Sequence, residues 1–131
     1  MTAVDLHLSD STENQNKHFH FVICGAGPVG QALALELHRG GVTASEILLI
    51  DAKTAEQASK DARTIALSHG SQQLLERWQA SPQNATAIRE IHVSRRRHFG
   101  RTLIQANDYQ LPALGYVVRY GDIIAPLERS L

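Results

Sequence analysis

Three glycines stand at the junction of two regular elements in the sequence GAGPVG, residues 25–30, and this junction constrains the fold more than any other feature. The preceding residues 18–24, HFHFVIC, are short, aromatic and branched, which predicts a strand. Pro28 suits the first turn of a helix, and Gly40 and Gly41 predict its end. Glycine at such a junction indicates a backbone that turns sharply or that a ligand approaches closely.

The elements around this loop predict a parallel βαβ unit. The helix after the loop has an apolar face formed by Val29, Leu33 and Leu37, with Ala32 and Leu35 nearby. The apolar run SEILLID, residues 45–51, is continuous rather than alternating, which predicts a strand buried on both faces of a parallel sheet. Strand, helix and strand in this order favour an α/β fold with a Rossmann-like dinucleotide-binding unit.

The middle of the chain departs from a simple repetition of this unit. The polar stretch at residues 52–64 predicts a loop, and residues 66–79, ALSHGSQQLLERWQ, predict a helix. Ser68 and Ser71 are its candidate N-caps, and its apolar side is formed by Leu74, Leu75 and Trp78. An antiparallel strand pair is predicted from residues 88–94 and 101–106, with a turn that ends near Gly100.

The last part of the chain predicts a strand at residues 116–120 followed by a helix that Asp122 caps. Ile123, Leu127 and Leu131 form the apolar face of this helix, and no later segment is present to cover it. We therefore expect that face to be left exposed at the C-terminus.

Composition limits the classes of function. The 131 residues fit one domain, and 13 basic residues balance 13 acidic ones, so net charge favours neither a nucleic-acid nor a membrane partner. The single Cys24 excludes an internal disulfide and indicates a reducing compartment. Residues 1–17 are polar without an apolar signal segment, which predicts a disordered tail before a domain at residues 18–131.

The glycine loop predicts a phosphate-binding turn. Gly25 permits the turn, Gly27 lets a pyrophosphate approach the backbone, and Gly30 lets helix and strand pack closely. The phosphates would lie at the positive end of the helix dipole. Asp51, at the end of the second strand, can accept hydrogen bonds from an adenosine ribose. An ordinary strand–helix turn with a terminal aspartate is the alternative, and the motif leaves FAD and NAD both open.

Several blocks in order carry a family resemblance: GAGPVG, DARTIALSHGSQQLLERW, IREIHVSRRRHFGRT and LPALGYVVRYGD. They resemble the N-terminal part of the FAD-dependent hydroxylases of ubiquinone biosynthesis, such as 2-polyprenyl-6-methoxyphenol hydroxylase, which share the para-hydroxybenzoate hydroxylase fold. A later GD segment typical of the family is absent. The chain thus resembles an FAD-binding front that is truncated before the substrate-binding part.

The resemblance implies an FAD-dependent monooxygenase that uses NAD(P)H as reductant and hydroxylates a prenylated phenol. It implies a cytoplasmic protein and leaves open association with the inner membrane or with a biosynthetic complex. It assigns no catalytic residue to this chain, which alone is expected to be inactive. The residues that it places at the cofactor are Gly25, Ala26, Gly27, Pro28, Val29, Gly30, Asp51 and Arg63.

Other residues have simpler interpretations. His18 and His20 would share a strand face, but no third ligand has metal-binding spacing with them. The arginines of SRRRHF, residues 94–99, are expected to be solvated at a turn rather than bound to nucleic acid. Cys24 is expected to be a small buried residue. A stand-alone FAD- or NAD-binding module without catalysis remains the alternative to an enzyme fragment.

Overall fold

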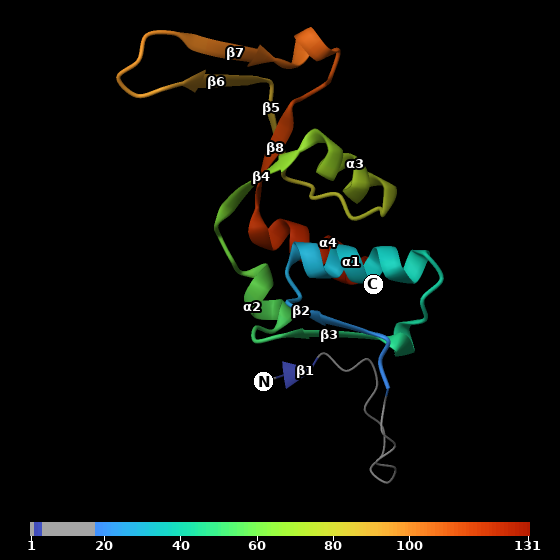
Figure 1. Cartoon of the computed structure of the whole chain (residues 1–131). Helices are drawn as coiled ribbons and strands as arrows, with labels where there is room; N and C mark the ends of the chain where they lie inside the picture. Colours follow the sequence, from blue (N-terminus) through green and yellow to red (C-terminus); the bar gives the residue numbers. More distant parts are fainter. Residues whose placement is uncertain (1, 4–17) are drawn as a thin grey trace.

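The computed structural model describes residues 2–3 and 18–131 and is a mixed α/β structure (Figure 1). The described residues form four α-helices, and their strands pair in both parallel and antiparallel ways. The predicted N-terminal tail lies outside the described residues except for β1, Thr2–Ala3, which runs antiparallel to β3, Ile47–Asp51. No helix in the described part of the chain is both long and apolar enough to cross a bilayer.

The predicted strand–helix–strand arrangement is present. Strand β2, Phe21–Cys24, pairs in parallel with β3, and helix α1, Pro28–Arg39, connects them through a single 3₁₀ turn, η1, Ala44–Glu46. Gly40 caps the helix, as predicted, because the chain turns there toward Gly41 at a φ of 101°. Helix α1 lies over one face of this sheet (Figure 1).

Two predictions about burial around this sheet are wrong. Strand β3 is half-buried along its whole length rather than buried on both faces, because α1 covers one face only. The buried side of α1 is formed by Gln31, Ala34 and Leu35, whereas Val29 and Leu33 of the predicted face are exposed. The apolar periodicity of this helix is compatible with burial of either side. Packing against the terminal helix buries the side that contains Ala34 and Leu35.

A second sheet has the order β4-β8-β5, with both outer strands antiparallel to the central one. Its strands are β4, Thr64–Ser68; β5, Thr86–Ile88; and β8, Gly115–Arg119. Helix α3, His69–Arg77, follows β4 directly and begins three residues later than predicted. The helix prediction is wrong for residues 66–68, which belong to β4. Ser68 is its N-cap, as one of the two alternatives predicted, since its hydroxyl accepts a hydrogen bond from the backbone N–H of Ser71 at 3.0 Å.

The predicted loop at residues 52–64 contains a short helix, α2, Ala55–Ser59, and the loop prediction is wrong there. Thr54 and Gln57 cap each other's backbone N–H groups at its start, and Lys60 pairs with Glu56 four residues earlier. The capping residues were visible in the sequence, but the segment is too polar to show an apolar face.

The terminal helix, α4, Tyr120–Ser130, is the centre of the core rather than an exposed element. Its side chains Ile123, Ile124 and Leu127 are fully buried, so the expectation of an uncovered apolar face is wrong. Ile123 and Leu127 pack with Leu35 of α1, Trp78 after α3 and Val118 of β8. The N-cap is Arg119, and Asp122 lies in the first turn instead of capping the helix, while Leu131 is exposed.

The predicted antiparallel pair is confirmed, but Ile88 belongs to β5 and Ala106 to the 3₁₀ turn that follows the pair. Strands β6, Glu90–Ser94, and β7, Arg101–Gln105, form a separate two-stranded sheet that projects from the rest of the molecule (Figure 1). Gly100 ends its turn at a φ of 106°, which glycine adopts without strain. A 3₁₀ turn, η2, Ala106–Tyr109, leads back toward β8.

Candidate functional site

The glycine loop lies at the carboxyl ends of the parallel strands β2 and β3. Gly25 adopts a φ of 115°, and its N–H donates a hydrogen bond to the Ile50 carbonyl oxygen at 2.7 Å. A Cβ on Gly30 would overlap with the carbonyl oxygen of Gly25, so α1 and the loop pack too closely for any side chain there. These two positions meet the steric requirements predicted for them, namely a sharp turn and close helix–strand contact.

The carboxylate of Asp51 joins the end of β3 to this loop. Its Oδ2 accepts a hydrogen bond from the backbone N–H of Ala26 at 2.7 Å, and its Oδ1 accepts one from the N–H of Lys53 at 2.8 Å. These N–H groups, that of Lys53 first, lower the pKa of Asp51 below its ordinary value of 3.8, so the group is a carboxylate at neutral pH. The structure therefore brings Asp51 and the loop together, as the motif predicts.

The start of helix α1 is open to an anion. Gly27 is the N-cap, no side chain caps the helix, and its first turn contains no acidic residue. The first N–H that bonds back into the loop is that of Gln31, to the carbonyl oxygen of Gly27 at 3.0 Å. Helix geometry leaves the N–H groups of Val29 and Gly30 without an intrahelical partner, and Pro28 has none to offer. The positive end of the helix dipole and these two backbone N–H donors therefore lie together at the start of α1.

Tyr120, at the start of α4, adds a residue to the site that the sequence did not indicate. Its hydroxyl oxygen lies 2.7 Å from the position that a Cβ on Gly27 would occupy. The Tyr120 ring also faces Arg63, whose guanidinium carbon is 5.2 Å from the ring centroid. Arg63 thus reaches the neighbourhood of the loop through Tyr120, and no hydrogen bond joins it to residues 25–30 or to Asp51 among the described residues.

Arg63 is anchored by Asp61 in the same DAR segment. Its Nε and Nη2 donate to the two carboxylate oxygens of Asp61 at 2.9 and 2.6 Å. This guanidinium lowers the pKa of Asp61 to about 2, and the pair raises the pKa of Arg63. Asp61 has a mostly buried side chain, while Arg63 is largely exposed, so the remaining guanidinium donors face solvent.

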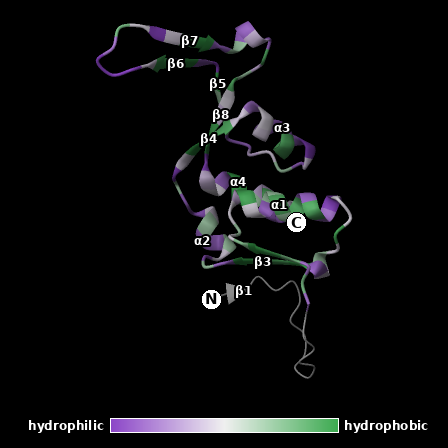
Figure 2. Cartoon of the chain, viewed as in Figure 1, coloured by the Kyte–Doolittle hydropathy of each residue, from purple (hydrophilic) through white to green (hydrophobic). Residues whose placement is uncertain are grey.

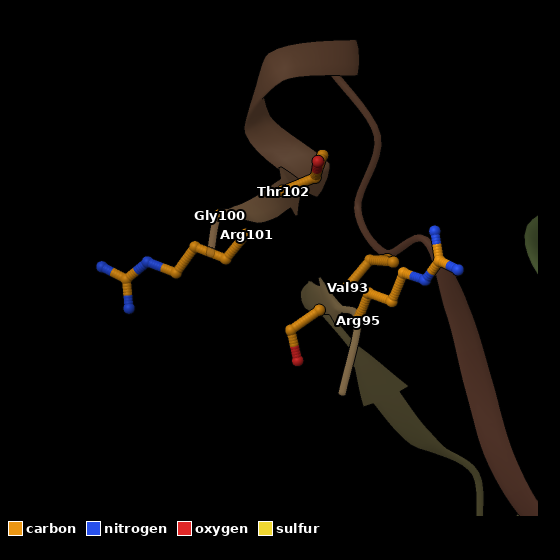
Figure 3. A pocket seen from close by; sticks show the side chains of 6 residues that line it. Val93, Arg95, Gly100, Arg101 and Thr102 are labelled. Atoms are coloured by element: carbon orange, nitrogen blue, oxygen red, sulfur yellow. The ribbon is translucent and has the colours of Figure 1, made fainter. Parts of the chain in front are cut away.

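Two hollows lie at different distances from this loop. An apolar one of about 160 Å³ begins at Pro28 and Val29 and continues between α3 and α4 to Trp78 and Leu127. Another of about 430 Å³ lies at the far end of the β6–β7 hairpin, where Arg95 and Arg101 extend away from each other (Figure 3). Neither encloses the polar groups of Asp51 and the loop backbone.

Two other sequence interpretations change. His18 and His20 precede β2 instead of sharing its face; their rings stack edge-on with centroids 5.5 Å apart, and His20 contacts Glu46 at 2.6 Å. Cys24 is exposed, contrary to expectation, because nothing in the described chain covers the end of β2 on that side. Residues 2–3 and 18–131 contain no group of three or more His, Cys, Asp or Glu residues arranged to hold a metal ion.

No model of a known protein family matches the chain. The resemblance to the ubiquinone-pathway hydroxylases therefore stays a prediction from the quoted sequence blocks. The geometry of the glycine loop, Asp51 and Tyr120 stands independently of it.

Proposed function

We propose that this chain forms the adenosine- and pyrophosphate-binding front of an FAD-dependent aromatic monooxygenase. The observation that supports this most directly is the hydrogen bond from the Ala26 N–H to Asp51 Oδ2, which fixes a carboxylate beside a glycine loop at the carboxyl ends of two parallel strands. Dinucleotides bind at this place in Rossmann-like folds, with phosphates on the loop and ribose on the acid. The proposal includes a Rossmann-like assignment for β2, α1 and β3.

The residues present fit the adenosine end of such a cofactor. Gly27 keeps the loop backbone free of a Cβ. Helix geometry leaves the N–H groups of Val29 and Gly30 without an intrahelical partner at the positive end of the helix dipole, where a phosphate would be stabilised. The two Asp51 oxygens accept backbone hydrogen bonds from Ala26 and Lys53, and a carboxylate has enough lone pairs to accept ribose hydroxyls as well. A second phosphate group on that ribose would be repelled by the carboxylate, which favours FAD or NAD over a phosphorylated dinucleotide.

Tyr120 and Arg63 would contribute at the phosphate side of the loop. The Tyr120 hydroxyl lies next to Gly27 and can donate a hydrogen bond to a phosphate oxygen. Arg63 stacks on that tyrosine and retains free guanidinium donors, so it can add positive charge without leaving Asp61. The resemblance likewise places Arg63 near the cofactor.

The choice of FAD and of a monooxygenase depends on the family resemblance. When bound, the flavin would supply the oxygen chemistry after reduction by NAD(P)H, and a prenylated phenol would be the substrate. The described residues of this chain would bind and orient the adenosine half of the cofactor. They include no residue to which we assign a catalytic role.

A panel of four ligands tests the proposal on the purified chain. We expect FAD and ADP to bind in competition with each other, because both carry the adenosine diphosphate that the loop and Asp51 address, and FMN to bind at least roughly tenfold more weakly. Calorimetry or fluorescence quenching of FAD would measure this. FMN binding as tightly as FAD would contradict the site assignment, and a clear preference for NAD over FAD would favour the stand-alone dinucleotide module.

A further inference from the structure

The end of the β6–β7 hairpin concentrates positive charge at a projecting point of the molecule. Residues 95–101, here called the arginine tip, contain Arg95, Arg96, Arg97, His98, Phe99 and Arg101, and every one of them is exposed. The tip is a hydrophilic turn at the end of the molecule away from α1 and the β1-β3-β2 sheet (Figure 2). Phe99 in its middle is fully exposed, which is unusual for so large an apolar side chain.

The four arginines of the tip form no ion pair or side-chain hydrogen bond within the part of the chain that the structure describes. Because the whole chain has 13 basic and 13 acidic residues, the part outside the tip holds four more acids than bases. The charge along the neutral chain is therefore uneven, with a positive tip and an excess of acidic residues in the rest of the sequence.

The backbone of the turn displays these side chains outward. Arg97 and Gly100 adopt positive φ angles of 63° and 106°, and the N–H of His98 bonds to the Arg95 carbonyl oxygen at 3.1 Å, which closes the turn. Arg95, directly after β6, and Arg101, at the start of β7, extend in opposite directions (Figure 3). Phe99 thus lies between Arg97 and Arg101 in the sequence of the turn, and its side chain is fully exposed.

We propose that the arginine tip docks the protein onto a bilayer that contains anionic phospholipids. Arginine side chains near such a surface gain attraction from the lipid headgroups, and an apolar side chain among them can enter the headgroup and acyl boundary. The rest of the chain, in which acidic residues outnumber basic ones, is repelled by the same surface. The hairpin would therefore contact the bilayer, and the β1-β3-β2 sheet would lie away from it. The inference does not depend on the cofactor proposed above.

The shape and composition of the tip favour a bilayer over a nucleic acid. Single-stranded nucleic acid is bound in grooves where several aromatic side chains stack on successive bases. The tip is a projecting turn with one aromatic residue, Phe99, which phosphate groups alone would leave exposed to water. A lipid surface offers both the anionic layer and an apolar phase beneath it.

Flotation with vesicles tests the proposal on the whole 131-residue chain. We expect binding to vesicles of equal parts phosphatidylcholine and phosphatidylglycerol, reversal by salt, and no binding to pure phosphatidylcholine vesicles. The triple variant Arg95→Gln, Arg96→Gln, Arg97→Gln should lower the partition coefficient by roughly a hundredfold, given the usual contribution of each basic residue near an anionic bilayer. Its matched control, Arg39→Gln, Arg77→Gln, Arg129→Gln, removes the same charge from exposed helix ends away from the hairpin and should bind as the parent does.

A fluorescent variant tests insertion at Phe99 itself. In Phe99→Trp, lipids with brominated acyl chains should quench the added emission, while Trp78, buried in the core, serves as an unquenched internal reference. Equal loss of binding in the two triple variants would overturn the proposal, because only net charge would then matter. Equal binding to neutral vesicles, absence of quenching at position 99, or tighter tip-dependent binding to an RNA or DNA oligomer than to vesicles would also overturn it.

Discussion

The hydroxyl oxygen of Tyr120 lies 2.7 Å from the position where a Cβ on Gly27 would begin. The two residues come from opposite ends of the described domain, and their contact couples the first turn of α4 to the N-cap of α1. The φ of Gly27 is −72°, an extended conformation that any residue adopts, so glycine is not required there for backbone reasons. Glycine is needed there because a side chain would fill the space next to its Cα. The Tyr120 hydroxyl lies in that space, and a phosphate bound to the loop would also lie there.

Gly27→Ala combined with Tyr120→Phe separates the effect of crowding the Tyr120 hydroxyl from the effect of obstructing a phosphate. Gly27→Ala alone should lower the free energy of unfolding by about 1 kcal/mol, because the methyl group crowds a flexible hydroxyl and alanine is a poor N-cap. Removing the hydroxyl in the double variant should recover part of that loss, since the next ring atom of Tyr120 is 3.9 Å away. Thermal or urea unfolding of the four proteins measures the coupling.

FAD affinity should not recover in the same way. The alanine methyl would still occupy the phosphate cradle in the double variant, so FAD binding should stay roughly tenfold or more below that of Tyr120→Phe alone. Normal FAD binding by the stable double variant would show that phosphates do not approach Gly27.

Gly30→Ala in α1 should be strongly destabilising. The added methyl would overlap with the backbone carbonyl of Gly25, which cannot move without disturbing the hydrogen bond from Gly25 to Ile50. We expect a loss of about 3 kcal/mol or more in unfolding free energy. The matched control is Gly70→Ala in α3, where the nearest side-chain atom is 3.9 Å away and helix propensity predicts a gain of up to about 1 kcal/mol. Similar unfolding midpoints for the two variants would contradict this geometry.

Asp51→Ala should weaken both the fold and FAD binding. Two backbone N–H groups lose a charged acceptor, which should cost about 1–3 kcal/mol of stability, and the loss of ribose hydrogen bonds should reduce FAD affinity by about 1–3 kcal/mol. Asp108→Ala, at an exposed turn beside the hairpin, is the control and should change neither. If Asp51→Ala bound FAD with the parent affinity, Asp51 would not contact the ribose, and its role would be to connect β3 to the loop.

The pH dependence of that variant follows from the lowered pKa of Asp51. Because the folded-state pKa lies below the unfolded value, the carboxylate stabilises the fold above pH 3.8, and the benefit is lost as the pH falls through the folded-state pKa. The stability difference between the parent and Asp51→Ala should therefore be constant near neutral pH and should shrink below pH 3.8. Urea unfolding at stepped acidic pH values checks the direction.

Arg63→Gln should raise the pKa of Asp61 from about 2 toward its ordinary value of 3.8. The side-chain hydrogen bonds from Arg63 are the main cause of the lowered pKa, and the second cause, the backbone N–H of residue 63 at 3.1 Å, survives the substitution. The rise should therefore be incomplete. Carboxyl-carbon NMR titration measures it, and an unchanged Asp61 pKa would show that the pair does not persist in solution.

Local signals in the sequence predicted the elements that their own residues determine. The loop of residues 25–30, the end of α1 at Gly40, and the hairpin turn at Gly100 follow from glycine and proline chemistry within a few residues. Asp51 was placed correctly because the ends of parallel neighbouring strands meet at one edge of a sheet. The short helix α2 was missed because its signal is a capping box without an apolar stripe.

The remaining features depend on contacts between distant segments. The buried side of α1 is selected by α4, which lies at the other end of the sequence, so Val29 and Leu33 could not be separated from Ala34 and Leu35 by periodicity alone. The burial of Ile123 and Leu127 requires α1, α3 and β8 to surround α4. The contact of Tyr120 with the loop likewise follows from the order of the second sheet, in which β8 lies between two strands that are earlier in the chain.

The purified 131-residue chain should bind FAD without hydroxylating a phenol. The loop and Asp51 address the adenosine diphosphate half of the cofactor, and the hollow that begins at Pro28 and Val29 has a volume of about 160 Å³. Pockets that enclose drug-sized ligands are typically about 300–1,000 Å³, so this hollow is too small to hold an isoalloxazine ring and a prenylated phenol together. Without that positioning, most of the rate enhancement is lost. Oxygen consumption and hydroxylated product would be measured with excess FAD, NADPH and a prenylated phenol. Product formation at ordinary enzyme rates, in step with oxygen uptake, would show that the described residues already contain an active site and that the interpretation as a binding front is wrong.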